Sequence, residues 1–151
     1  MGREWCGVIP FYDGQGGNGS KKYSLEGEEV LDSRRVTTVM DGLYDLGLVD
    51  MDKVFHLLER YFERRKFLPY VYGRDQIFIP VKMRIPIGKN DGAYGYIRIG
   101  EIESLEDQVI TLKNGLTFPV LESCSTLEKR IREGKISHYI IEEREYFFQA
   151  Y

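Results

Sequence analysis

The chain has 151 residues, a net charge of −3 and 42% hydrophobic residues, which suits one folded domain, 1–151, with a sizeable buried core. Two cysteines are too few for a disulfide framework or a cysteine-rich zinc site. No run of about eighteen apolar residues predicts a membrane span. We therefore expect a cytoplasmic protein that has no membrane contact.

Positive charge is concentrated in the middle of the chain. Residues 1–59 have a net charge of −5, residues 60–100 of +6 and residues 101–151 of −4. The middle segment also contains eight phenylalanines and tyrosines. This mixture is typical of a nucleic-acid surface and equally of the flank of a β-rich core.

The first thirty residues predict a hairpin. Trp5–Tyr12 has strand composition, and Lys22–Leu31 is expected to return antiparallel to it after a glycine-rich turn. Within the turn, Gly14-Gln-Gly-Gly-Asn-Gly19 formally matches the dinucleotide-binding pattern and nearly matches a phosphate-binding loop. No helical sequence follows, and Ser20 stands where that loop needs lysine. We interpret the segment as a hairpin tip.

Two helices are predicted next. Ser33 can cap a helix that runs to about Leu46, and Asp50 can cap a second one that runs to about Lys66. Apolar residues recur at the helical period in both, which predicts an αα-hairpin over about 33–66 that packs on a sheet. A helix-turn-helix is the alternative, but the second helix would expose carboxylates, which phosphates repel. These carboxylates are Asp52, Glu59 and Glu63.

The composition then changes to that of strands. Gln76–Met83 and Tyr94–Ile102 are rich in β-branched and aromatic residues. Pro80 and Pro86 remove ladder donors, so Ile79–Ile87 should be an edge, a bulge or a kinked strand.

A second hairpin and a short helix follow. Asn114-Gly115 lies between Val109–Leu112 and Leu116–Leu121 and predicts a type I′ turn. Ser125 and Glu128 match a capping box, and Gly134 can end the helix, which predicts a helix over about 126–133. Closing strands or a short helix are expected over Ile136–Ile141 and Tyr146–Phe148. The expected fold class is α+β, an antiparallel sheet of hairpins with helices.

No catalytic or metal constellation is apparent. His56 and His138 lie outside any motif, and no metal-ligand spacing occurs. Cys124 near a helix start is a candidate nucleophile, yet no partner base accompanies it. We therefore expect no enzyme, no metal and no cofactor.

Exposed cations of the second half are the candidate nucleic-acid contacts, because lysine and arginine neutralise phosphates. The alternative interpretation of such residues is an ordinary solvated surface. The candidates are Arg84, Lys89, Arg98, Lys113, Lys129, Arg130, Arg132 and Lys135.

Residues 70–135 resemble the C-terminal half of the competence transcription factor (ComK) family of Gram-positive bacteria. The likeness is carried by Gln76-Ile-Phe-Ile-Pro80, Gly95-Tyr-Ile97, Val109-Ile-Thr-Leu-Lys-Asn-Gly115 and the polar helix start at 123–129. Tyr94-Gly-Tyr96 stands where the family tends to have a Cys-x-Trp-like element. A looser likeness is to the LytTR-type output domain, which also binds DNA.

The resemblance implies a transcription activator that binds double-stranded DNA at A/T-rich boxes, largely through the minor groove, as an oligomer. Arginines on loops or strands can select such DNA, since A-tracts narrow the minor groove and deepen its negative potential. Two alternatives remain. One is a non-enzymatic protein–protein interaction module, and the other is an enzyme that uses Cys124 or the glycine-rich loop.

Overall fold

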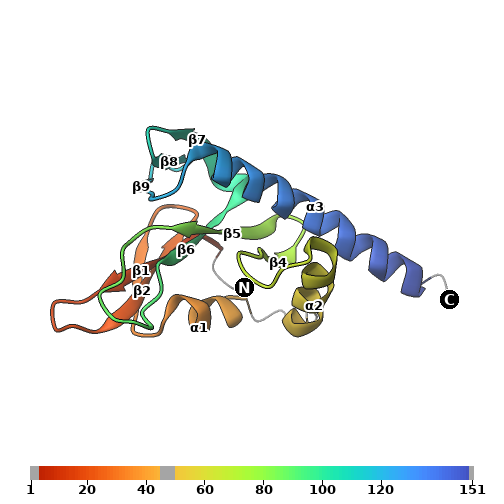
Figure 1. The fold of residues 1–151 in the computed structure, drawn as a ribbon. Helices are drawn as coiled ribbons and strands as arrows, with labels where there is room; N and C mark the ends of the chain where they lie inside the picture. Colours follow the sequence, from red (N-terminus) through yellow and green to blue (C-terminus); the bar gives the residue numbers. More distant parts are fainter. Residues whose placement is uncertain (1–3, 45–49, 150–151) are drawn as a thin grey trace.

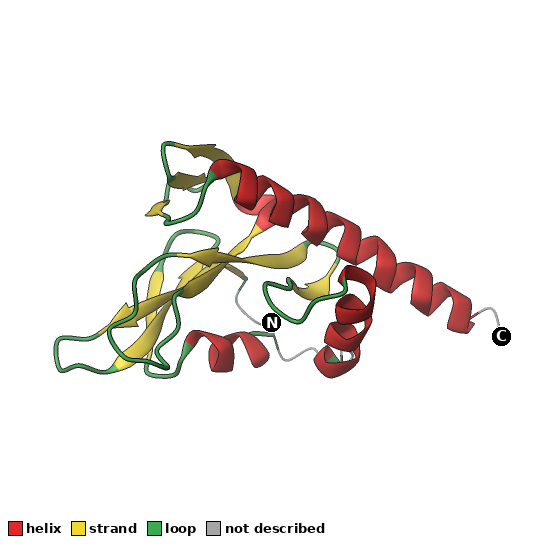
Figure 2. Ribbon diagram, in the orientation of Figure 1, coloured by secondary structure: helices red, strands yellow, loops and turns green. Residues whose placement is uncertain are grey.

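Residues 4–44 and 50–149 are described by the computed structural model, and they form an α+β fold as predicted. A six-stranded and a three-stranded sheet, both antiparallel, pack with three helices in this part of the chain (Figures 1 and 2). The larger sheet has the order β3-β2-β1-β6-β5-β4. Its strands are β1 (Trp5–Tyr12), β2 (Asn18–Ser24), β3 (Glu29–Asp32), β4 (Tyr70–Gly73), β5 (Gln76–Lys82) and β6 (Tyr94–Arg98).

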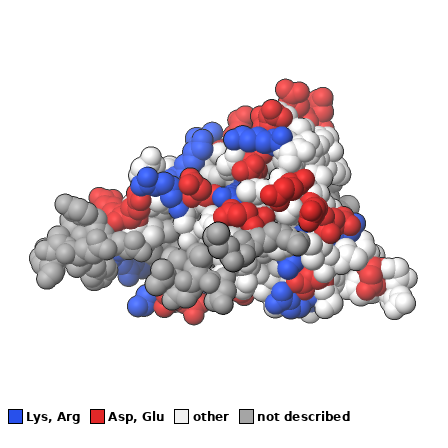
Figure 3. Space-filling model, turned by 180° about the vertical axis from the view of Figure 1, so that it is seen from behind, with Lys and Arg blue, Asp and Glu red and all other residues white. Residues whose placement is uncertain are grey.

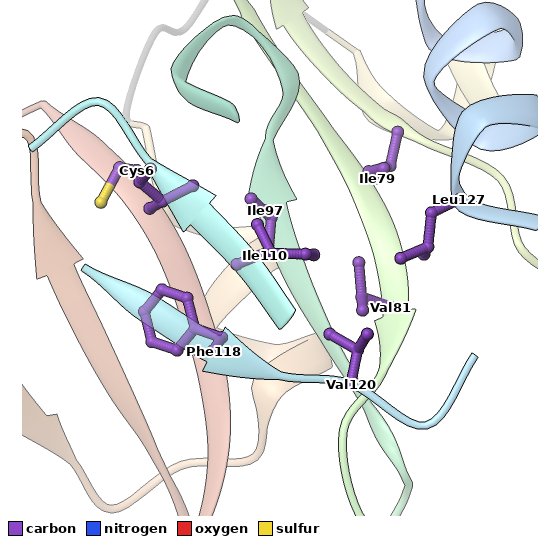
Figure 4. Packing of buried hydrophobic residues seen from close by; sticks show 9 residues of the cluster. Cys6, Ile79, Val81, Ile97, Ile110, Phe118, Val120 and Leu127 are labelled. Carbon is purple, nitrogen blue, oxygen red and sulfur yellow. The ribbon is translucent and has the colours of Figure 1, made fainter. Parts of the chain in front are cut away.

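Successive residues of the central strands face opposite sides of the larger sheet. Ile79 and Ile97 pack with Leu127 and the three-stranded sheet, whereas Phe78 packs with Met40 on the other side. Figure 4 shows the first of these clusters, in which side chains from β5 and β6 point toward the smaller sheet and the last helix. The sheet is therefore buried on both faces at its centre.

The N-terminal hairpin is confirmed, but the returning segment is divided into two strands. β2 begins at Asn18, inside the predicted turn, and β3 follows it as the sheet edge. The tip is short because the Asp13 carboxylate accepts hydrogen bonds from the backbone N–H groups of Gln15 and Gly17, at 2.8 and 2.7 Å. A strand follows the last glycine, whereas a dinucleotide-binding loop opens a helix there.

Asp32 ends the edge strand in a position that makes stability depend on pH. Its carboxylate accepts hydrogen bonds from the side chain and backbone of Arg34, and Lys22 lies 3.6 Å away. The bonds from Arg34 hold the pKa of Asp32 well below its usual value. A carboxyl with a lowered folded-state pKa stabilises the fold above its unfolded pKa of about 4, and this contribution is lost as the pH falls further.

We therefore expect acid to destabilise the wild type more than an Asp32→Asn variant, since the variant has already lost the interaction. Urea unfolding at pH 5, 4, 3 and 2 measures the difference in slope. Asp75→Asn is the matched control, because Asp75 is exposed and forms no ion pair in the described ranges. Equal acid sensitivity of Asp32→Asn and the wild type would contradict the assignment.

Both predicted helices of the αα-hairpin are present, but they are shorter than expected. α1 spans Val36–Asp41, and Gly42 ends it, so the predicted start at Ser33 is wrong. Leu46 and Gly47, the predicted end, lie outside the described residues. α2 spans Met51–Phe62, with Asp50 capping it as predicted through the N–H groups of residues 52 and 53.

The two helices pack on different parts of the molecule. α1 lies on β1, β2 and β6, whereas α2 contacts β4 and the last helix. α2 ends at Glu63, which has a left-handed backbone conformation, three residues before the predicted end.

Pro80 lies in a strand with one free side. β4 pairs with the first half of β5, from Gln76 to Phe78, so among the described residues the half that contains Pro80 has β6 as its only neighbouring strand. The prediction of an edge position is confirmed for this half. A 3₁₀ turn, Ile99–Glu101, then ends β6 and directs the chain into the smaller sheet, β7 (Ile102–Glu106), β8 (Val109–Leu112) and β9 (Thr117–Pro119).

The hairpin of β8 and β9 is confirmed, but the predicted type I′ turn is wrong. Of Asn114 and Gly115 only the glycine has a positive φ, and the N–H of Leu112 bonds to the carbonyl of Leu116 at 2.8 Å. These bonds fit a three-residue loop with glycine in the left-handed position. Two consecutive positive φ angles occur instead at Asp107-Gln108, between β7 and β8.

The last helix, α3, spans Cys124–Gln149 and is much longer than predicted. Ser123 caps it by accepting a hydrogen bond from the N–H of Thr126, so the capping box assigned to Ser125 is wrong. Gly134 does not end the helix. Its Cα is buried where a Cβ would lie 3.2 Å from Ile77, so the glycine lets α3 approach β5 closely.

Of the two predictions for the C-terminal segment, closing strands or a short helix, the structure shows a helix. The segment 136–141 continues α3, and His138 lies on it. Figure 1 shows α3 running along the sheet and extending past it toward the C-terminus. No helix in the described ranges is both long and apolar enough to cross a membrane.

Candidate nucleic-acid interface

Arg98, a predicted DNA contact, is buried inside the fold. It is 7% exposed and forms an ion pair with Glu4. Its Nε also donates to the carbonyl of Asp75 at 2.7 Å. A guanidinium that is already paired and covered has a structural role in joining the N-terminus to β6.

Arg130 is buried as well, and it covers the part of β5 that does not pair with β4. Its guanidinium pairs with Glu122 and donates to the carbonyl of Pro80 at 3.0 Å. The Glu122 carboxylate accepts the N–H of Lys82 at 2.7 Å, and the carbonyl of Lys82 accepts the N–H of Leu121. These side chains replace the neighbouring strand that β5 lacks beyond β4.

Arg84 is half-buried beneath the loop that joins β5 to β6. It lies over the ring of Tyr12, 4.0 Å from the centroid, and donates to the carbonyls of Asp91 and Gly92 at 2.8 and 2.9 Å. Its Nη1 is buried and has no acceptor among the described residues. The guanidinium therefore anchors the loop and retains one unsatisfied donor.

The other five predicted contacts are exposed, but they lie in separate places. Lys89 is on the β5–β6 loop and Lys113 is on the β8–β9 turn, while Lys129, Arg132 and Lys135 are on α3. None of the five forms an ion pair within the part of the chain that the structure describes. On the face shown in Figure 3, acidic and basic side chains are interleaved. That face offers no continuous basic surface.

A hollow of about 790 Å³ lies between α3 and the end of β6 and is lined in part by Arg98 and Lys135. Arg74 at its rim pairs with Glu142, and the His138 ring lies 3.2 Å from the same carboxylate. Arg74, Arg98 and His138 are engaged by Glu142 or Glu4, and the carboxylates of Asp75 and Glu101 also line the hollow, so it is a weak candidate for an anionic ligand.

A smaller hollow, of about 320 Å³, has a different character, and we refer to it as the basic hollow. It lies where the β5–β6 loop meets the start of α1 and the segment after α2. Two exposed cations, one half-buried arginine and three aromatic rings line it together. These side chains are Arg35, Lys66, Arg84, Phe67, Tyr94 and Tyr96.

The carboxylate nearest to the basic hollow is engaged in holding the loop. Asp91 accepts a hydrogen bond from the Tyr12 hydroxyl at 2.6 Å and another from the N–H of Gly88 at 2.8 Å. The bond from Tyr12 lowers the pKa of Asp91. Arg35 and Lys66 form no ion pair within the described ranges, but Arg35 donates to the carbonyl of Asn90 and its charge also lowers the pKa of Asp91. Both side chains are exposed and can also reach a ligand.

Phe67 is held in an unusual conformation beside the basic hollow. Its φ of 62° lies in the left-handed region, which a bulky side chain rarely adopts, and its ring is 39% exposed. The ring lies 5.1 Å from that of Tyr94 and 4.8 Å from the Arg130 guanidinium. Arg64 fixes the backbone by donating to the Phe67 carbonyl and pairing with Glu133 on α3. Strain of this kind often marks a functional surface.

Sequence reasoning missed Arg35 and Lys66 as members of this site. They are 31 positions apart and belong to segments of opposite net charge. The one usable signal was the aromatic-basic mixture of residues 60–100, which contains Lys66 and Phe67. Nothing in the sequence indicates that Arg35 donates to the carbonyl of Asn90, at 2.6 Å.

The structure gives little support to the remaining candidates for catalysis or metal binding. Cys124 is exposed, and partial desolvation together with Glu128 raises its pKa, whereas an activated nucleophile needs a lowered one. His56 lies on α2 near Glu59 and at the edge of another shallow hollow. Within the described residues no cluster of three or more potential metal ligands occurs.

Comparisons of the chain with known protein families, with curated proteins and with solved structures give no match. The resemblance to the competence factors therefore rests on the sequence motifs alone.

Proposed function

We propose that this protein is a DNA-binding transcriptional regulator, an activator similar to the competence transcription factors, and that it contacts A/T-rich DNA at the basic hollow. The observation that carries the proposal is the group of Arg35, Lys66 and Lys89. These cations surround or flank one hollow, and none forms an ion pair within the described residues. Free cations on neighbouring loops are suited to contact successive phosphates of one duplex.

The arrangement supports groove binding by loops. The exposed side of α2 mixes Asp52 with Lys53 and Arg60, and Glu59 is half-buried, so this helix offers no uniformly basic face for the major groove. The β5–β6 loop carries Arg84 and Lys89, and Arg35 and Lys66 lie in the hollow beside it. The preference for A/T-rich DNA follows from the deep negative potential of narrow minor grooves.

Fluorescence anisotropy with a labelled A-tract duplex tests the proposal. Three neutralised phosphates give a log–log slope of about −2.7, which makes binding about 40-fold weaker at 200 mM than at 50 mM salt. A G·C duplex of equal length should bind more weakly at both concentrations. The expected result is thus salt-dependent binding that favours the A-tract.

Absence of binding by micromolar protein at 50 mM salt would refute the proposal. The interaction-module alternative would then be preferred. Ile136 and Tyr139 on α3, which are 42% and 69% exposed, would be the first residues to substitute in a search for a protein partner.

A further inference from the structure

The loop that joins β5 to β6 exposes two large apolar side chains. Ile85 is 80% exposed and Ile87 is 84% exposed, and no other large hydrophobic residue in the described ranges is as exposed. Pro86 lies between them and restricts the backbone. Isolated apolar residues are common on surfaces. Two isoleucines that are separated by one residue and exposed to this degree are unfavourable in water unless a binding partner covers them.

Polar contacts on the inner side hold this loop in place. The Tyr12 hydroxyl accepts the N–H of Ile87 at 2.8 Å and donates to Asp91, which in turn accepts the N–H of Gly88. Asn18 donates to the Asp91 carbonyl at 3.0 Å. These hydrogen bonds fix the backbone of the loop, so the fold itself holds the two isoleucines in exposed positions.

Arginines reinforce the same loop from two sides. Arg84 stacks on Tyr12 and bonds to the Asp91 and Gly92 carbonyls, and Arg35 bonds to the Asn90 carbonyl. The loop is therefore a stiff projection that needs little ordering on binding, which reduces the entropic cost.

Positive charge lies beside the apolar tip. Lys89 follows it by two residues, and Arg35 and Lys66 line the basic hollow at the base of the loop. The one carboxylate of the loop, Asp91, is engaged by Tyr12 and Gly88. An apolar tip between free cations complements a base-pair stack that lies between two phosphate chains.

We propose that this loop is an intercalating wedge: Ile85 and Ile87 insert between base pairs from the minor groove and kink the duplex, while the cations of the basic hollow hold the flanking phosphates. The inference rests on the proposed function and extends it with a recognition mechanism. Unstacking one base step is unfavourable, and burial of the two side chains together with the added phosphate contacts offsets this cost. Flexible TpA steps lower this cost, so the wedge would add to the A/T preference.

The test uses a duplex with a central TpA step that contains 2-aminopurine, and a second duplex that carries a fluorophore pair at its ends. Wild-type protein should raise the 2-aminopurine fluorescence by unstacking the step and should shorten the end-to-end distance by bending. Ile85→Ser combined with Ile87→Ser should abolish both signals and weaken binding about tenfold. Its melting temperature should match the wild type, since both side chains are exposed.

Ile136→Ser combined with Tyr139→Ser is the matched control, because it removes two exposed apolar side chains from α3 and should leave both signals intact. Wild-type protein that binds without unstacking or bending the DNA would overturn the wedge and leave the DNA-binding proposal standing. The wedge is also refuted if the double Ile→Ser variant still bends the duplex. If the wild type does not bind DNA at all, both proposals fall.

Discussion

Replacing Arg130 by methionine is expected to lower the free energy of unfolding by about 3–5 kcal/mol, because it leaves the buried carboxylate of Glu122 without its partner. The two side chains are 9% and 10% exposed, so solvent cannot compensate for the lost charge. The carbonyl of Pro80 loses its hydrogen bond at the same time. Urea denaturation followed by circular dichroism measures the change.

Two further variants make this result specific. Combining Arg130→Met with Glu122→Gln removes the buried charge, and the amide oxygen can still accept the N–H of Lys82. The double variant should therefore recover to within about 1–2 kcal/mol of the wild type. Arg132→Met, at an exposed position of the same helix, should change stability by less than about 0.5 kcal/mol. A loss in Arg130→Met no larger than in Arg132→Met would show that the pair does not support the edge of β5.

The role of Arg130 also explains a limit of sequence reasoning about this site. An arginine on a helix is normally solvent-exposed, and its neighbours in the sequence gave no sign of burial. Arg98 is buried because Glu4, 94 positions away, lies beside it. Both residues were predicted as DNA contacts from charge alone, and the pairing that occupies them depends on the tertiary fold.

The fold was predictable where short-range signals dominate. The hairpin of β8 and β9 and the Asp50 cap of α2 depend on neighbouring residues, and both are found. α3 was not predictable in this way, because its β-branched residues and Gly134 indicate a strand and a helix end. Packing on Ile77 and Ile79 overrides both preferences, since a glycine is what allows helix and sheet to approach there.

The basic hollow, like the full length of α3, depends on the tertiary fold and could not be predicted from local sequence. Arg35, Lys66 and Arg84 come from three segments, and they converge because the larger sheet places β1 between β2 and β6. Local sequence contains the charges and the aromatic rings. It does not contain the distances between them, and these decide which cations are free to bind phosphate.

Removing Arg35 and Lys66, which line the basic hollow, together with Lys89 on the adjoining β5–β6 loop, should have the largest effect on DNA binding. We expect Arg35→Gln, Lys66→Gln and Lys89→Gln together to weaken binding of the A-tract duplex about 500-fold at 0.1 M salt, since each lost phosphate contact removes about 0.9 decades of affinity at that concentration. The log–log salt slope should become shallower by about 2.7. Anisotropy titrations at four salt concentrations measure both quantities.

A variant with the same change in net charge separates this interface from a general effect of charge. Lys129→Gln, Arg132→Gln and Lys135→Gln remove three exposed cations from α3, which were predicted contacts and lie outside the lining of the basic hollow. Only the long-range field changes in this variant, so binding at 0.1 M salt should weaken less than about fivefold, because salt screens distant charges. The reverse order of effects would assign the phosphates to α3 and remove the basic hollow from the interface, and it would leave DNA binding itself in place.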